Sequence, residues 1–429
     1  MDLTRRQLLG TAGVFSASAL LAGCAGFSRP DSGGGEGGAD LTFTTWASES
    51  EEVVFRSLVD RFQEANGVTV NLNVVPYEQI FRNIDAQLQS GTAPDVFRVD
   101  YGNLGVYSSQ EQLLDLSDLV DNGNDFIPAF WQAVQFDGTP FGVPHQTDVS
   151  AIVYNVAAFQ AAGITSVPDS LESAWTWDEF SGVLAQLRGS LPPEQYPFVY
   201  NWQLGGAPRW LSFLFAAGGR FVEDDLVTPA IDSDAGRRAL DYTKGFFEQS
   251  WVPANSAVKS STYADAVFLA ETAVMASAGS FVVPGLDAAG FEWATTYLPR
   301  DQRGATDLGG NALVATAGTA NPDLAAEFLR FMVEQEAMAE FCAATNELPT
   351  LTSLVDTELD YAVRPDVMPV FVQQATTLEE SDVAQLTIPG MASVTTALQD
   401  QLDLAFTSGQ STEQTLANLS DAIGQATGA

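Results

Sequence analysis

The sequence has few of the side chains that metal and redox sites require. Its 429 residues include two cysteines, Cys24 and Cys342, and a single histidine, His145. Clusters of cysteine or histidine that could hold zinc or an iron–sulfur group are therefore excluded. We expect no metal and no cofactor. After the N-terminal segment no uncharged apolar run reaches the ~20 residues of a membrane-spanning helix, so we expect the body of the chain to lie outside the membrane.

Positive charge is also scarce. Eighteen Lys and Arg face 55 Asp and Glu, which gives a formal net charge of −37. Nucleic acid is excluded as a partner because phosphate binding needs a basic face. Two interpretations of the acidity stay open. It could serve a basic partner, or it could keep the surface hydrated in concentrated salt, where the Debye length falls to about 3 Å. The acids are scattered along the whole chain, which favours the second interpretation and an extreme halophile as the source.

The first 23 residues have the pattern of a secretory signal peptide. Arg5-Arg6 followed by Gln-Leu-Leu resembles a twin-arginine export signal, and Leu21-Ala-Gly-Cys24 resembles a lipoprotein box. We therefore predict cleavage before Cys24, lipid attachment to its sulfur, and a flexible linker over 24–39. The predicted location is the extracytoplasmic face of the cell membrane, anchored through Cys24. A plain signal peptide with an incidental cysteine remains the alternative.

Strand and helix patterns alternate after the linker. Strands are expected at 41–46, 68–75 and 94–100, with amphipathic helices at 51–65 and 77–90 between them. This βαβαβ order predicts a parallel sheet with helical crossovers.

Later segments continue the α/β pattern. Residues 147–155 form an apolar run typical of a buried strand, and Thr176 with Glu179 forms a capping box that opens a helix. We expect one long helix at 324–344, and Cys342 inside it as a small buried hydrophobe. A chain of this length can form two lobes, each with its own core.

A series of short motifs occurs in an order that resembles the extracellular solute-binding proteins of ABC transporters, family 1, the maltose-binding type. The motifs include Gly91-Thr-Ala-Pro-Asp-Val, Gly142-Val-Pro-His-Gln-Thr-Asp, Thr176-Trp-Asp-Glu-Phe, Leu308-Gly-Gly-Asn and Ala326-Glu-Phe-Leu-Arg-Phe. Each motif alone is weak evidence for the family, but the motifs in this order, after an export signal, are strong evidence.

The resemblance implies an α/β, two-lobe periplasmic-binding-protein-like fold of type II, hinged, with a mostly parallel sheet flanked by helices in each lobe. Lobe 1 would contain 40–147 and 297–346, and lobe 2 would contain 148–296 and 347–429. It also implies a binding function and no enzymatic one. The chain would be a monomer that captures a carbohydrate, mono- or oligosaccharide, by hinge closure and delivers it to permease subunits with a cytoplasmic ATPase.

Candidate site residues follow from what a sugar needs, namely aromatic platforms and polar groups that bond paired hydroxyls. In lobe 1 and at the first crossing, the strand ends and the resemblance favour Trp46, Ser48, Glu49, Asp100, Tyr101, His145 and Asp148. In lobe 2 the resemblance favours Trp202, Trp210, Gly279 and Phe281, and in a loop of lobe 1 it favours Gly309, Gly310 and Asn311.

Two other functions stay open. A glycerol-3-phosphate or other phosphorylated-solute binder would share the fold but would need cations at the phosphate, for which Arg98 and Arg209 are the nearest candidates. A secreted glycosidase could use paired carboxylates such as Asp100 and Asp148. Among 55 acids some pair can always be nominated, so this second signal is nearly empty.

Overall fold

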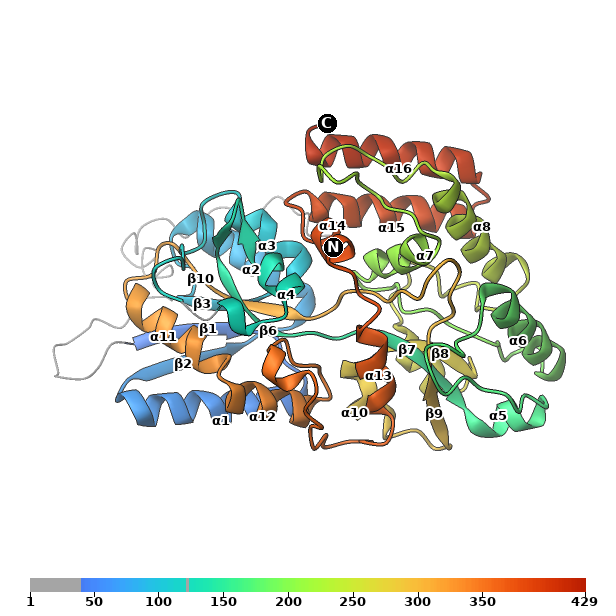
Figure 1. Ribbon diagram of the computed structural model, residues 1–429, viewed down its shortest axis with the longest axis horizontal. Helices are drawn as coiled ribbons and strands as arrows, with labels where there is room; N and C mark the ends of the chain where they lie inside the picture. Colours follow the sequence, from blue (N-terminus) through green and yellow to red (C-terminus); the bar gives the residue numbers. More distant parts are fainter. Residues whose placement is uncertain (1–39, 121–122) are drawn as a thin grey trace, which may run out of the picture. The chain divides into compact units, whose positions relative to one another are not determined.

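Two separate β-sheets organise the chain (Figure 1). The structure is a computed structural model and describes residues 40–120 and 123–429; the predicted signal peptide, the predicted lipidation site Cys24 and the predicted linker 24–39 lie outside these residues. A short hairpin of β4 (Gln135–Phe136) and β5 (Thr139–Pro140) accompanies the first sheet. None of the helices within the described ranges is long and apolar enough to cross a membrane.

The first sheet has five strands in the order β2-β1-β3-β10-β6. They are β1 (Asp40–Thr45), β2 (Thr69–Val74), β3 (Val96–Asp100), β6 (Gly142–Gln146) and β10 (Asn311–Ala315). β1 pairs in parallel with β2 and with β3, through crossover helices α1 (Glu49–Asn66) and α2 (Tyr77–Ser90). β10 runs antiparallel to both of its neighbours, β3 and β6. The predicted βαβαβ unit and the mostly parallel sheet are confirmed for this lobe.

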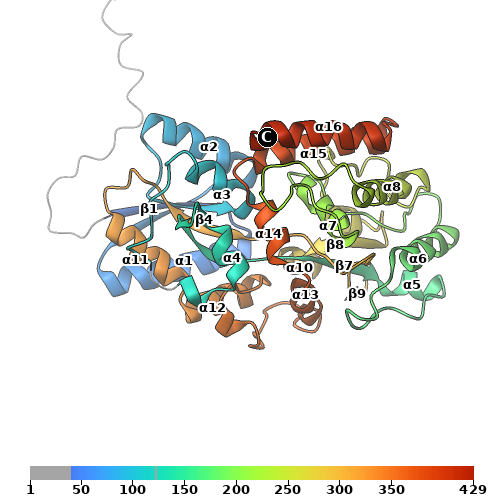
Figure 2. The ribbon, with the colours of Figure 1, turned by 45° about the horizontal axis from the view of Figure 1, so that its top comes forward.

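Helices cover both faces of the first sheet (Figure 2). One face packs against α1, α11 (Pro322–Met332) and α12 (Gln335–Thr345), in a core that contains Phe43, Phe55 and Cys342. The other face packs against α2, α3 (Tyr101–Ser108) and α4 (Pro128–Ala133), around Phe97 and Val99. Cys342 is fully buried, as predicted.

The single long helix predicted at 324–344 is two helices. α11 ends at Met332 and α12 begins at Gln335, because Glu334 takes an extended conformation (φ −58°, ψ 148°). No glycine or proline marks the break, so the sequence carries no signal for it. The break lets α11 pack on β10 and α12 pack on α1, which one straight helix could not do.

The second sheet has three strands in the order β8-β7-β9. They are β7 (Ser150–Asn155), β8 (Met275–Gly279) and β9 (Trp293–Thr296). β7 pairs antiparallel with both neighbours, so the prediction of a mostly parallel sheet is wrong for this lobe. The reason is connectivity. A helical crossover makes β8 and β9 run the same way, while β7 enters between them directly from β6, in the opposite direction.

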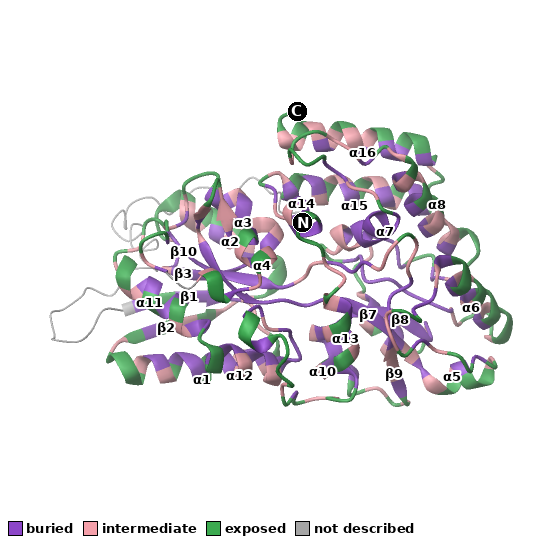
Figure 3. Cartoon of the chain, viewed as in Figure 1, coloured by how far each residue is buried: buried purple, intermediate pink, exposed green. Residues whose placement is uncertain are grey.

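Helices also cover the second sheet, and Figure 3 shows the strands buried beneath them. The remaining helices are α5 (Val156–Ala161), α6 (Trp177–Ser190), α7 (Leu211–Ala216), α8 (Asp234–Glu248), α9 (Ala264–Leu269), α10 (Val283–Leu286), α13 (Met368–Ala375), α14 (Glu380–Leu386), α15 (Met391–Thr407) and α16 (Thr412–Thr427). Single 3₁₀ turns occur at η1 (Gly123–Asp125), η2 (Ala207–Trp210), η3 (Ser280–Val282) and η4 (Thr352–Leu354). The capping box predicted for Thr176 and Glu179 is present at the start of α6.

Three chain segments link the two sheets and hydrogen-bond to one another. Thr147 and Leu348 exchange both backbone bonds, each 2.8 Å long, and the N–H of Gly309 donates to the carbonyl of Asp148 at 3.0 Å. α14 adds a further link, because Val383 lies in the apolar cluster of α2, α3 and α4. The carboxyl end of β3 and the loops of the second lobe meet at this junction.

Candidate functional site

Asp100 is the last residue of β3 and is half-buried. Its Oδ2 accepts hydrogen bonds from the hydroxyl of Tyr77 (2.9 Å) and from Nδ2 of Asn103 (3.3 Å). With its amide oriented to satisfy its neighbours, Asn311 donates to Oδ1 of Asp100 at 2.7 Å. Burial raises the pKa of Asp100, although the Tyr77 hydroxyl and the charge of Arg98 oppose this shift. The predicted residue is thus a carboxylate fixed by three donors at the edge of the sheet.

Trp46 follows β1 and lies beside Asp100's partner Tyr77. Its indole makes edge contacts with Tyr77 (5.3 Å between ring centroids) and Phe81 (5.9 Å). The guanidinium carbon of Arg98 lies 4.7 Å from the centre of the Trp46 ring. Trp46 is half-buried and Tyr77 is 39% exposed, so aromatic surface is available at this edge.

Ser48 and Glu49 form the start of α1. The Ser48 hydroxyl accepts from the N–H of Glu51 (3.3 Å), and the Ser48 N–H donates to the carboxylate of Glu51 (2.6 Å), which completes a capping box. Glu49 is exposed in the first turn, where a negative charge suits the helix dipole. The geometry accounts for both residues by capping, and we leave them out of the proposed site.

Tyr101 and His145 lie in the core of the first lobe, and we withdraw both from the site. Tyr101 is 2% exposed and donates its hydroxyl to the carbonyl of Gln146 at 3.1 Å. His145 is fully buried, stacked on Phe55 and in edge contact with Phe341. Burial, assisted by the charge of Arg98, lowers the pKa of His145 well below its ordinary value, so the ring is neutral. The sequence position suggested a crossing, but β6 turns this side chain inward.

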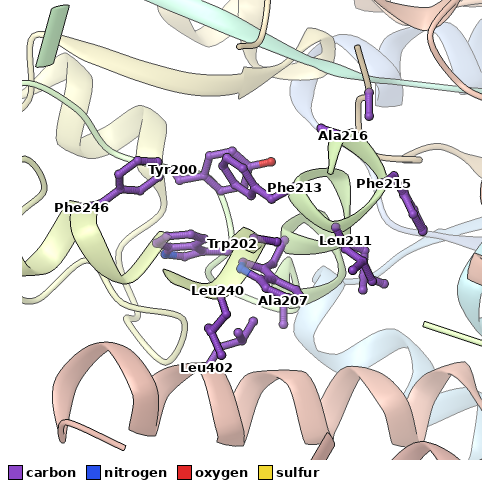
Figure 4. Packing of buried hydrophobic residues seen from close by; sticks show 14 of the residues in the cluster. Tyr200, Trp202, Ala207, Leu211, Phe213, Phe215, Ala216, Leu240, Phe246 and Leu402 are labelled. Carbon is purple, nitrogen blue, oxygen red and sulfur yellow. The ribbon is translucent and has the colours of Figure 1, made fainter. Parts of the chain in front are cut away.

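Trp202 and Trp210 are also core residues and leave the proposed site. Both are fully buried, and each indole N–H has a partner, the Ser256 carbonyl for Trp202 and the Thr243 hydroxyl for Trp210. Figure 4 shows Trp202 among apolar side chains between the loop at 200–207 and α15. The loop contains Gly205 and Gly206. Its tryptophans anchor it to the second-lobe core.

Asp148 and three of the predicted glycines come together at the crossings. A Cβ on Gly309 would lie 2.3 Å from the carboxylate oxygens of Asp148, and one on Gly279 would lie 3.1 Å from Oδ1. Gly310 has a φ of +92° and packs against the backbone of Thr147. Burial raises the pKa of Asp148 to about 6, against the opposing charge of Arg209. Oδ1 of Asp148 has no hydrogen-bond partner among the described residues.

Arg209, on η2 of the second lobe, faces these carboxylates. Its guanidinium bonds to Asp307, and Nη1 lies 3.8 Å from Oδ1 of Asp148. The other oxygen of Asp307 accepts from the backbone N–H of Ser150 at 3.0 Å. Asp307 therefore orients Arg209 towards Asp148.

Phe281 and Tyr263 continue this cluster from the second lobe. Both are half-buried; their ring centroids are 6.4 Å apart, and Phe281 lies 5.8 Å from the guanidinium carbon of Arg209. The two lobes face each other here. The pKa of Asp100 is raised by burial, and the charge of Arg209 from the second lobe is one of the influences that oppose this rise; a Cβ on Gly205 of the second lobe would lie 3.9 Å from the Tyr77 hydroxyl.

Sequence reasoning missed Tyr77, Tyr263 and Asp307 and gave Arg209 a different role. Tyr77 opens a helix directly after β2, at the edge where sheet ligand sites lie, so its position carried a usable signal. Tyr263 and Asp307 lie in irregular segments whose path depends on the whole fold.

The brought-together groups suit an uncharged, hydroxyl-rich molecule. Asp100 and Asp148 can accept hydrogen bonds, Arg209 and the Tyr263 phenol can donate, and Trp46 and Phe281 offer ring surface to an apolar sugar face. Three carboxylates face one guanidinium, and that guanidinium is already paired.

Comparisons with known proteins agree with the fold and with a binding role. The chain is 24% identical over 371 residues to the diacetylchitobiose-binding protein DasA of Streptomyces coelicolor, covering 82% of this chain and 83% of that protein. It is 25% identical to the maltodextrin-binding protein MdxE of Bacillus subtilis, covering 78% of each.

Solved structures show the same fold at lower identity. A solute-binding protein of an ABC transporter from Thermotoga lettingae, bound to α-D-tagatose, superimposes with a TM-score of 0.77 at 18% identity, covering 91% of this chain and all of that one. The GacH receptor of Streptomyces glaucescens gives 0.76 at 19% identity, covering 90% and 98%. The two-lobe type II fold is thereby confirmed. The family model for bacterial extracellular solute-binding proteins matches residues 57–368, most of the chain, and the chain belongs to that family.

Proposed function

We propose that the chain captures a neutral carbohydrate between its two lobes and delivers it to an ABC importer. The relatives in sequence are named for binding diacetylchitobiose and maltodextrin, and the structural neighbours were solved with tagatose or acarbose. The aromatic and carboxylate groups at the junction of the sheets offer the contacts that a sugar needs.

The charges at the site favour a neutral ligand over an anionic one. Arg98 is 1% exposed and paired with Glu51, and the charge of Arg209 is balanced by Asp307, so neither guanidinium offers an unbalanced positive charge to a phosphate. Asp100, Asp148 and Asp307 would repel an anion. These facts argue against the glycerol-phosphate alternative, and the names of the relatives as binding proteins argue against a glycosidase.

Hinge closure is part of the proposal. The crossings near Asp148, Tyr297 and Glu347 would act as the hinge between 40–147 plus 297–346 and 148–296 plus 347–429. α14 departs from these boundaries. It belongs to the range 347–429 of lobe 2 but packs on α4 of lobe 1. The permease would read the closed form.

Tethering completes the proposal. The twin-arginine motif at Arg5-Arg6 and the box ending at Cys24 support export and lipidation. Mass spectrometry of the N-terminal peptide from the membrane fraction tests this: a lipid on Cys24 is expected, and an unmodified Cys24 would remove the anchor.

Calorimetric titration and thermal shift in molar salt test the ligand class. We expect one of maltotetraose, diacetylchitobiose or tagatose to bind, and glycerol 3-phosphate not to bind. At 100 times its Kd the ligand should stabilise the fold by about 2.7 kcal/mol. Chromatography of the same mixtures should show the oligosaccharides intact. Binding of glycerol 3-phosphate alone, or release of free sugar, would contradict the proposal.

Asp100→Asn probes the site with a small change. The amide keeps the shape but loses the charge that strengthens hydrogen bonds to sugar hydroxyls, so Kd should rise at least about tenfold. The exposed Glu78→Gln on α2 is the matched control and should leave Kd within twofold. An unchanged Kd in Asp100→Asn would remove Asp100 from the site.

A further inference from the structure

Arg98 is a buried cation on the face of the first sheet that packs against α1 and α12. It lies on β3, two residues before Asp100, and is 1% exposed. Phe55 and Phe341 lie within 6.0 Å of its guanidinium carbon, measured to the ring centres. Burying a charge in such a place is costly unless every donor has a partner, so the contacts of Arg98 indicate its role.

One pair of contacts anchors the guanidinium. Nη1 donates to the carboxylate of Glu51 at 2.6 Å and to the carbonyl of Trp46 at 3.2 Å. Burial raises and the charge of Arg98 lowers the pKa of Glu51, and the outcome is a lowered pKa, so Glu51 is ionised. This ion pair alone would satisfy a structural role.

The other contacts lead towards the ligand. The guanidinium carbon lies 4.7 Å from the centre of the Trp46 ring. Nη2 lies 2.9 Å from the side-chain oxygen of Asn311, whose nitrogen in turn donates to Asp100 at 2.7 Å. Nη2 also lies 3.6 Å from Glu347, which directly precedes the third crossing. A single planar group therefore reaches both proposed ligand contacts of the first lobe.

We propose that Arg98 is a positioning residue for ligand binding, which holds the Trp46 ring directly and the Asp100 carboxylate through Asn311. This inference rests on the proposed function of the same site. Only a forked guanidinium can meet Glu51, Trp46 and Asn311 at once, whereas the single ammonium of lysine can keep the Glu51 pair but cannot also hold Asn311.

Arg98→Lys separates positioning from structure. The variant should stay folded, with a Kd at least tenfold higher for whichever of maltotetraose, diacetylchitobiose or tagatose binds the wild type most tightly. In an Asp100→Asn background the same substitution should raise Kd by clearly less, because the two residues act through one chain of hydrogen bonds. Arg56→Lys, on the surface of α1, is the matched control and should change neither.

A second readout needs no ligand. With 5-fluorotryptophan in all eight positions, the ¹⁹F resonance of Trp46, assigned by Trp46→Phe, should shift or broaden in Arg98→Lys. If Arg98→Lys does not fold, Asn311→Ser breaks the same chain, keeps the Arg98–Glu51 ion pair, and should raise Kd similarly.

The outcomes are distinct. An unchanged Trp46 resonance in Arg98→Lys would overturn the positioning role. So would a double variant whose rise in Kd equals the product of the rises measured for Arg98→Lys and Asp100→Asn alone. Failure of the wild type to bind any of the three sugars would count against the proposed function instead, and the Trp46 resonance would still decide the role of Arg98.

Discussion

The fold shifts the pKa of Asp148 into a range where its effect on stability can be measured. It is 5% exposed at the first crossing, and burial raises its pKa from 3.8 to about 6 despite the nearby Arg209. The folded protein therefore holds a proton that the unfolded chain releases between these values. The stabilising contribution of the protonated form is complete below about pH 4 and is lost as pH rises through 6.

Asp148→Asn should show this linkage directly. Between pH 5 and 7.5 the unfolding free energy of the wild type should fall by about 1.5 kcal/mol through this proton, and that of the variant should not. The unfolding free energy of the variant relative to the wild type should therefore rise by that amount. Urea denaturation in molar salt at both pH values measures it. Asp118→Asn, an exposed carboxylate, is the control. A gap that does not change with pH would contradict the burial argument.

At the scale of residues the sequence predicted part of the site. The structure brings together Asp100, Asp148, Trp46, Phe281 and the glycines. These residues end strands or lie at crossings, and the sequence pattern predicts where such positions fall. Trp202, Trp210 and His145 lie in the cores, and the sequence does not indicate this because an aromatic ring near a loop gives the same pattern whether it faces a ligand or a core. Only the packing distinguishes the two.

Among the elements, the segment that contains Gly309 and Gly310 is the most constrained. Gly310 has a φ of +92°, and a Cβ there would lie 2.4 Å from Cα of Thr147 and 2.5 Å from the carbonyl oxygen of Gln146. Backbone atoms cannot move aside as a flexible side chain can. Glycine is needed at this position because two crossings touch there.

Gly310→Ala should destabilise the fold by at least about 2 kcal/mol, from backbone strain together with the clash. Gly318→Ala is the matched control, since a Cβ there meets nothing within 4 Å. Chemical denaturation of both variants measures the difference. Equal stability of the two would show that the crossings are not packed as described.

Elements were predicted well where local signals are complete. The bounds of α2 and the capping box of α6 follow from turn and cap residues that the sequence displays. The break between α11 and α12 and the direction of β7 come from long-range packing and connectivity, which leave no local mark.

At the scale of the whole molecule, the net charge of −37 is the dominant fact. Repulsion among so many carboxylates opposes the compact state at low salt, and screening relieves it as the Debye length falls from about 10 Å at 0.1 M to about 3 Å at 1 M. The net charge thus predicts that the chain folds best in concentrated salt, which fits a halophilic source.

The unfolding temperature should rise steeply with KCl between 0.1 and 2 M. Differential scanning calorimetry measures it, and a variant with ten exposed Asp and Glu changed to Asn and Gln should show a weaker dependence. A flat response of the wild type would favour the other interpretation, an acidic face for a basic partner.

The most direct test of the central claim is a crystal structure of the protein with the tightest-binding sugar. The account predicts electron density for the sugar between the two sheets, in contact with Trp46, Asp100 and Arg209. Density for the sugar elsewhere on the molecule, or a charged ligand held by Arg209 after its pair with Asp307 has opened, would contradict it.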